Sequence, residues 1–195
     1  MTSGKPLALA FGIGLLTLFG SLSAAHAQPY YGAPPPVRGV YRSGLVFGGS
    51  LGAGAISSSN CGPYCGGAGA IEGHIGGMLT PRLALMGDFW GMAHHWDDGY
   101  GTGTTYHGLY TIAVQYWATD ILWLKGGIGF AQLVFGYDGE SVPDENGPGM
   151  MGAIGVEVLQ AYNFALDLQF RVGRGFYDTG PDVNNFAFMI GVNWY

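Results

Sequence analysis

Seven ionisable residues occupy alternate positions within apolar segments: Glu72, His74, Asp88, Lys125, Glu157, Asp167 and Arg171. Alternation along an extended chain places them on one face, opposite the large aliphatic residues. Because a buried charge needs a partner, we expect an interior salt-bridge network around Lys125 and Arg171 that fills the space between the segments. The open alternative is a narrow polar conduit or a ligand cavity. The glycines on the same face could leave water-filled space, or they could only let the sheet bend. They are Gly48, Gly52, Gly54, Gly127, Gly129, Gly155 and Gly173.

A second group of ligand-type residues lies where two apolar segments meet. His94 and His95 are followed by Asp97 and Asp98, and His107 begins the next segment. Strand pairing could bring His94 and His107 together. Two histidines with a carboxylate suit a transition metal, and a His/Asp pair suits general-base chemistry. No serine nucleophile lies nearby, so we expect polar rim residues, with no metal, no cofactor and no enzyme activity.

Eight segments with period-two hydrophobicity must position these side chains, and each is predicted to be a β-strand. They span residues 44–55, 71–79, 83–94, 106–116, 122–134, 153–158, 164–173 and 186–194. The face that carries the charges is rich in glycine and alanine, whereas the other face is aliphatic in its middle and aromatic at its ends. Glycine and alanine alone could not fill the core of a soluble sandwich. An aliphatic band flanked by aromatic residues fits hydrocarbon, which predicts a membrane-spanning barrel.

The predicted connections alternate between long and short. The short ones are 80–82, 118–120 and 160–163, and the long ones are 57–67, 95–104, 137–149 and 177–185. In outer-membrane barrels, short turns face the periplasm and long loops face outward. The fold class that we expect is therefore all-β: an eight-stranded antiparallel transmembrane β-barrel with short periplasmic turns and four longer extracellular loops.

The residues before the first strand are predicted to be an export signal and a lead-in. Lys5, the apolar run 7–22 and the sequence Ala25-His26-Ala27 are typical of a signal peptide that covers residues 1–27, although a single transmembrane anchor is the competing interpretation. Residues 28–43 are rich in proline and tyrosine and are expected to form a periplasmic lead-in to a barrel domain of residues 44–195. Export favours a disulfide between Cys61 and Cys65.

Composition narrows the functional classes further. Charged residues make up only 10% of the chain, well below the roughly 25% of soluble domains. The net charge of −6 argues against nucleic acid as a partner. Eight of the thirteen acidic residues lie in predicted outer loops, where they could share divalent cations with lipopolysaccharide or could simply be solvated.

The hairpin series from Gly44 to Tyr195, segments such as "LWLKGGIGF" and the aromatic C-terminal strand "NFAFMIGVNWY" resemble the eight-stranded outer-membrane barrels of the OmpA/OmpX-like type. The resemblance implies the outer membrane of a Gram-negative-type bacterium. It also implies that the barrel-assembly machinery recognises the C-terminal strand. The expected partners are outer-membrane lipid and lipopolysaccharide, and the expected state is a monomer.

The resemblance leaves the activity open. We expect a non-enzymatic, envelope-structural or surface-interaction role. A narrow, porin-like channel for ions or small solutes is the alternative, and a lipid-modifying outer-membrane enzyme is the third possibility.

Overall fold

The computed structural model describes residues 40–59, 62–97, 99, 101–137, 140–141 and 145–195. The contacts of the chain separate two units, Met1–Pro35 and Pro36–Tyr195, and the whole first unit lies outside the described residues. The predicted signal peptide, most of the predicted lead-in, and Cys61 therefore also lie outside the described residues. In the described part of the chain, no helix is long and apolar enough to cross a membrane.

Nearly every described residue of the second unit belongs to a β-strand. One short 3-10 turn, η3 (Gly62–Tyr64), follows the first strand. The strands are β1 (Leu45–Ser58), β2 (Gly66–Thr80), β3 (Leu83–Asp97), β4 (Thr102–Trp117), β5 (Leu122–Tyr137), β6 (Glu140–Ser141), β7 (Glu145–Ala161), β8 (Phe164–Gly175) and β9 (Val183–Trp194).

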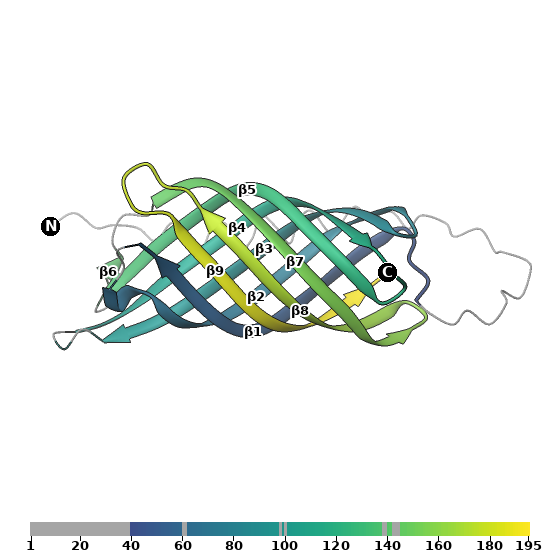
Figure 1. Ribbon diagram of the computed structural model, residues 1–195, viewed down its shortest axis with the longest axis horizontal. Coiled ribbons are helices and arrows are strands. Elements are labelled where there is room, and N and C mark those ends of the chain that lie inside the picture. The colour runs from purple at the N-terminus through teal and green to yellow at the C-terminus, as the bar shows by residue number, and fades with distance from the viewer. Residues whose placement is uncertain (1–39, 60–61, 98, 100, 138–139, 142–144) are drawn as a thin grey trace, which may run out of the picture. The chain divides into compact units, whose positions relative to one another are not determined.

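The eight long strands form one closed antiparallel barrel. Each pairs with the next along the chain, β5 pairs directly with β7, and β1 pairs with β9. The short β6 only extends the edge of β5. Figure 1 shows the strands crossing the barrel obliquely, the tilt that closure requires. The structure thus confirms the predicted eight-stranded fold. We call the end with the connections at 81–82, 118–121 and 162–163 the turn side, and the opposite end the loop side.

The strands extend further toward the loop side than their hydrophobicity predicts. β7 begins at Glu145 rather than at 153, and β3 and β4 continue to Asp97 and Thr102, which face each other in register. The connection at 98–101, predicted to be long, is therefore as short as the turn at 118–121. The physical reason is that backbone pairing continues where the side chains become polar, so the apolar alternation ends before the hydrogen-bonded ladder does.

The wall of the barrel is inverted relative to a soluble protein. Large apolar side chains point outward, with Ile128 74%, Ile112 69% and Phe188 67% exposed. The seven ionisable residues that the sequence singles out point inward and are buried. Aromatic pairs flank the aliphatic band on the turn side, where Phe47 stacks on Trp194 at 5.4 Å between ring centroids. Such a wall suits hydrocarbon, because its exposed surface matches the bilayer core.

The lumen is filled by two buried apolar clusters. The loop-side cluster comprises Ile56, Ala68, Ala70, Trp90, Met92, Leu109, Ala131, Leu133, Met151, Tyr177, Val183, Ala187 and Met189. The turn-side cluster comprises Val46, Ala84, Met86, Ala113, Trp117 and Trp123. Along β3 the order of inward residues is Met86, Asp88 and Trp90. A charged layer therefore separates the two apolar clusters.

Candidate functional site in the barrel lumen

Four charged side chains from four strands meet in this layer, and we call them the ion quartet: Glu72 (β2), Asp88 (β3), Lys125 (β5) and Arg171 (β8). Lys125 Nζ lies 2.9 Å from Asp88 Oδ2 and 3.4 Å from Glu72 Oε1. Arg171 Nη1 lies 3.0 Å from Glu72 Oε1, and Nη2 lies 2.5 Å from Asp88 Oδ1. Each carboxylate thus contacts both cations, and each cation contacts both carboxylates. No side chain of the quartet is more than 1% exposed.

The quartet spans the lumen rather than lining one wall. β8 is not a sheet neighbour of β2, β3 or β5, so Arg171 reaches Glu72 and Asp88 across the interior. Its guanidinium also lies over the Trp90 ring, 5.4 Å from the centroid. Two positive and two negative charges leave the quartet neutral, which is the arrangement that offsets the desolvation of buried ions.

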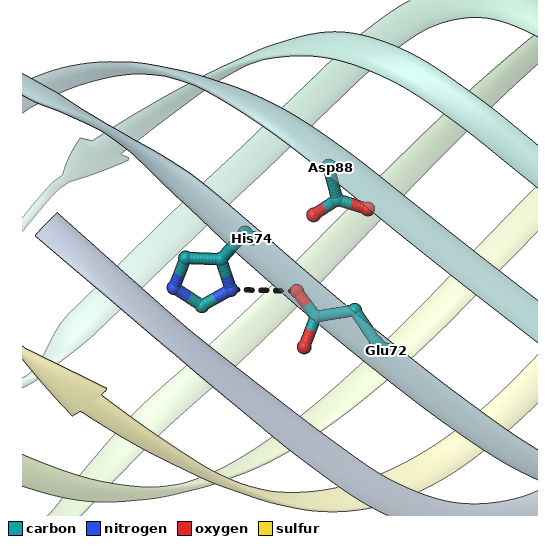
Figure 2. Close-up of side chains that lie close together, drawn as sticks. All are labelled: Glu72, His74 and Asp88. Carbon is teal, nitrogen blue, oxygen red and sulfur yellow. Dashed lines mark hydrogen bonds and ion pairs between the residues drawn. The ribbon is translucent and has the colours of Figure 1, made fainter. Parts of the chain in front are cut away.

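His74 borders the quartet and completes a set of metal-type ligands. Figure 2 shows Glu72 and His74 on one strand beside Asp88. His74 Nδ1 lies 2.7 Å from Glu72 Oε1. The ligand atoms of these three residues lie within 4.8 Å of one another, and no other such set occurs among the described residues. Both carboxylates already contact Lys125 and Arg171. A metal ion would have to displace these cations, so the geometry favours an internal salt-bridge network over a metal centre.

Glu157 forms a separate polar cluster on the turn side. Its Oε2 lies 2.5 Å from Arg42 Nη2, and its Oε1 accepts hydrogen bonds from Trp117 Nε1 at 2.7 Å and Tyr195 OH at 2.8 Å. The Arg42 guanidinium also lies over the Trp117 ring. Burial, with Glu157 beside it, raises the pKa of Tyr195 above its ordinary value, so the phenol stays protonated and donates.

Arg42 is a lumen residue that sequence reasoning missed, because it falls in the predicted lead-in 28–43. Val40 and Arg42 are both buried, and they continue the even-numbered inward positions of β1. Extending the period of two backward from Val46 would have found them.

Asp167 is inside the barrel but outside both ion clusters. It accepts hydrogen bonds from Asn193 Nδ2 at 2.7 Å and from Gln169 Nε2 at 3.2 Å. Among the described residues, no basic side chain lies within ion-pair distance of it. The seven predicted interior residues are therefore all buried, but they divide into the quartet with His74, the Glu157 cluster and Asp167.

On the lumen side, the inward glycines do not line open space. At each of the seven positions that the sequence singles out, an added Cβ would lie closer than 3.0 Å to another heavy atom. At Gly155 that neighbour is the indole of Trp123, and at Gly173 it includes the indole of Trp90. At Gly52, Gly54 and Gly129 it is backbone of the adjacent strand. These glycines therefore make room for two buried indoles and for close approach of the strands.

The rim histidines make separate contacts. His107 is 1% exposed, and its Nδ1 lies 2.6 Å from Asn185 Nδ2 of β9. His94 Nδ1 lies 2.7 Å from the carbonyl oxygen of Gly67 on β2, and His95 points outward and contacts Thr104. Each histidine thus has a partner on a different strand. Asp98, one of the predicted carboxylates, lies outside the described residues.

Cys65 follows η3 and is disulfide-bonded. Its predicted partner Cys61 lies outside the described residues, so this pairing stays a prediction.

Comparison with known proteins identifies the architecture. No protein-family model matches the chain, and no curated protein does either. Neisserial surface protein A has a similar structure, with a TM-score of 0.60 and 16% identity over 78% of this chain and 97% of that one. Ail, the attachment invasion locus protein of Yersinia pestis, matches with a TM-score of 0.55 and 12% identity over 78% of this chain and 98% of that one. It was solved in complex with the heparin analogue sucrose octasulfate. At these identities the likeness concerns the fold alone, and by its fold the chain is a small eight-stranded barrel of the outer-membrane type.

Proposed function

We propose that this chain is a closed, non-enzymatic barrel of a Gram-negative-type outer membrane, with an envelope-structural or surface-interaction role. The observation that carries the proposal is the filled lumen. Two apolar clusters lie on either side of a neutral ion quartet, and the indoles of Trp90, Trp117 and Trp123 are at most 1% exposed. A lumen packed in this way has no room for a passing solute.

Placement in the outer membrane is supported by the physical character of the wall. An outward band of aliphatic side chains, bordered by aromatic residues, would be costly in water and is favourable in hydrocarbon. Within this proposal the loop side faces outward. The C-terminal strand β9 would serve as the recognition segment for barrel assembly, and lipid and lipopolysaccharide would be the surrounding partners.

A surface role is supported by the charge of the loop side. Asp97 and Asp178 are exposed there, and Arg174 is paired with Asp182 at 2.5 Å. The names of the two similar proteins describe a surface protein and an attachment protein. An acidic rim would favour a basic partner, or divalent cations shared with lipopolysaccharide phosphates, because carboxylates are the preferred ligands of such cations.

Conductance in a planar bilayer tests the proposal. Residues 28–195, refolded and inserted, should produce no steady openings, because the lumen is filled along its length. Insertion is verified separately by protection of the strands from protease in vesicles. Steady openings whose size scales with salt concentration would contradict the closed-barrel proposal and favour the narrow-channel alternative. Failure to insert would contradict the membrane placement itself.

A further inference from the structure

The outward face of the barrel wall has a hollow that belongs neither to the lumen nor to the loops. It has a volume of about 520 Å³ and lies over β1 to β5. Its floor is made by small outward residues on β2, β3 and β4, namely Gly69, Gly91, Ala93 and Gly108. Gly91 and Gly108 face each other in register, so two neighbouring strands lack a side chain at the same level.

Large side chains surround this floor. Phe89 and Tyr110 form one side, with ring centroids 5.1 Å apart, and Tyr110 stacks in turn on Phe130 at 4.7 Å. Leu51 and Ile71 form a second side, and they are 66% and 53% exposed. The result is a slot with an apolar floor and apolar sides, open toward the surroundings of the barrel.

The position of the slot indicates what occupies it. It lies in the half of β3 and β4 nearer their connection at 98–101, and it is continuous with the apolar wall. Tyr106 and Gln132 also line it, and they add a phenol and an amide to an otherwise apolar surface. If the wall lies in hydrocarbon, an empty slot would forfeit dispersion contacts along its whole surface. A flexible hydrocarbon chain can enter a slot of this kind, whereas the convex wall of a second barrel would bridge across it.

We propose that this slot holds one fatty acyl chain of a bilayer lipid as a specifically bound lipid, from the leaflet on the loop side. The proposal rests on the membrane placement proposed above and adds a defined ligand site to it. Tyr106 and Gln132 lie where they can meet the polar end of the lipid, and the glycine floor admits its methylene groups.

Native mass spectrometry of the full chain tests the site. The protein is reconstituted into vesicles of phosphatidylethanolamine and phosphatidylglycerol, re-extracted in mild detergent, and examined for retained phospholipid. Gly91→Leu would fill the slot from its floor. There an added Cβ meets only the ends of flexible side chains, Phe89 Cζ at 3.0 Å and Ile71 Cγ2 at 3.7 Å. Displacing the contacts of about two methylene groups is enough for about a tenfold loss of bound lipid.

Gly126→Leu is the matched control. Gly126 is also an outward glycine of the wall, an added Cβ there meets nothing within 4 Å, and it does not line the slot. We expect one retained phospholipid on the unsubstituted protein and on Gly126→Leu, and about tenfold less on Gly91→Leu.

Equal retention by all three proteins, or no retention by any, would overturn the inference. Dimers that disappear in Gly91→Leu would overturn it in favour of an interface between copies. Protease protection in the vesicles separates the two proposals, because a barrel that inserts but retains no lipid refutes the slot alone.

Discussion

Removing Lys125 should destabilise the barrel far more than removing an exposed charge. In Lys125→Met, Arg171 would remain as the only Lys or Arg paired with Glu72 and Asp88 among the described residues, at a site where no side chain of the quartet is more than 1% exposed. Breaking a buried ion pair costs about 3–5 kcal/mol, because a charge is left without compensation. With a urea dependence of about 1–3 kcal/mol per molar, the unfolding midpoint should fall by at least about 1 M.

Two further variants make this prediction specific. Lys125→Met combined with Asp88→Asn restores neutrality through the remaining pair of Arg171 and Glu72, which lie 3.0 Å apart, and it should recover most of the loss. Asp120→Asn removes the exposed pair with Arg82, whose side chains are 56% and 80% exposed, and should cost about 0–1 kcal/mol.

The assay is urea unfolding of the refolded barrel in vesicles, followed by tryptophan fluorescence and by the shift in electrophoretic mobility between folded and unfolded forms. If Lys125→Met lowers the midpoint no more than Asp120→Asn, the quartet does not stabilise the lumen. If the double variant is no more stable than Lys125→Met alone, charge balance is not the reason for the loss. Either result would refute the reasoning.

Two other predictions concern packing and pH. Gly155→Ala should lower the free energy of unfolding by about 1–3 kcal/mol in the same assay, because the added methyl group would meet the indole of Trp123. Gly126→Ala, where an added Cβ meets nothing within 4 Å, should leave the free energy of unfolding unchanged. Equal effects of the two substitutions would show that the indole can move aside. The pKa of Tyr195 is raised in the folded state. The protonated phenol of Tyr195 therefore contributes fully to stability below the ordinary tyrosine pKa of about 10, and this contribution is lost as the pH rises above that value. The unfolding midpoint of Tyr195→Phe should therefore depend less on pH above about 10 than that of the unsubstituted barrel, and parallel curves would contradict this role for the phenol.

Much of the fold could be predicted because the side chains of a strand alternate strictly between two faces. The positions of Asp167 and Arg171 in the lumen, and of Leu168 and Phe170 on the wall, depend only on counting by two along β8. The positions of the strand ends could not be found in this way. Asp97 and Thr102 pair through their backbones, and the hydrophobic pattern does not report backbone pairing.

The sequence by itself determined the number of strands, their order and the face on which nearly every residue lies, because each of these follows from local periodicity and chain continuity. The tertiary structure decided which charges meet. Arg171 reaches Glu72 and Asp88 across the lumen, and Arg42 reaches Glu157 from before the first strand, since strand tilt and a narrow interior bring distant residues to one level. The tertiary structure also decided that the inward glycines accommodate indoles, and that Gly91 and Gly108 open a slot in the wall. Both of these features depend on the register between neighbouring strands, and the sequence of a single strand does not contain that register.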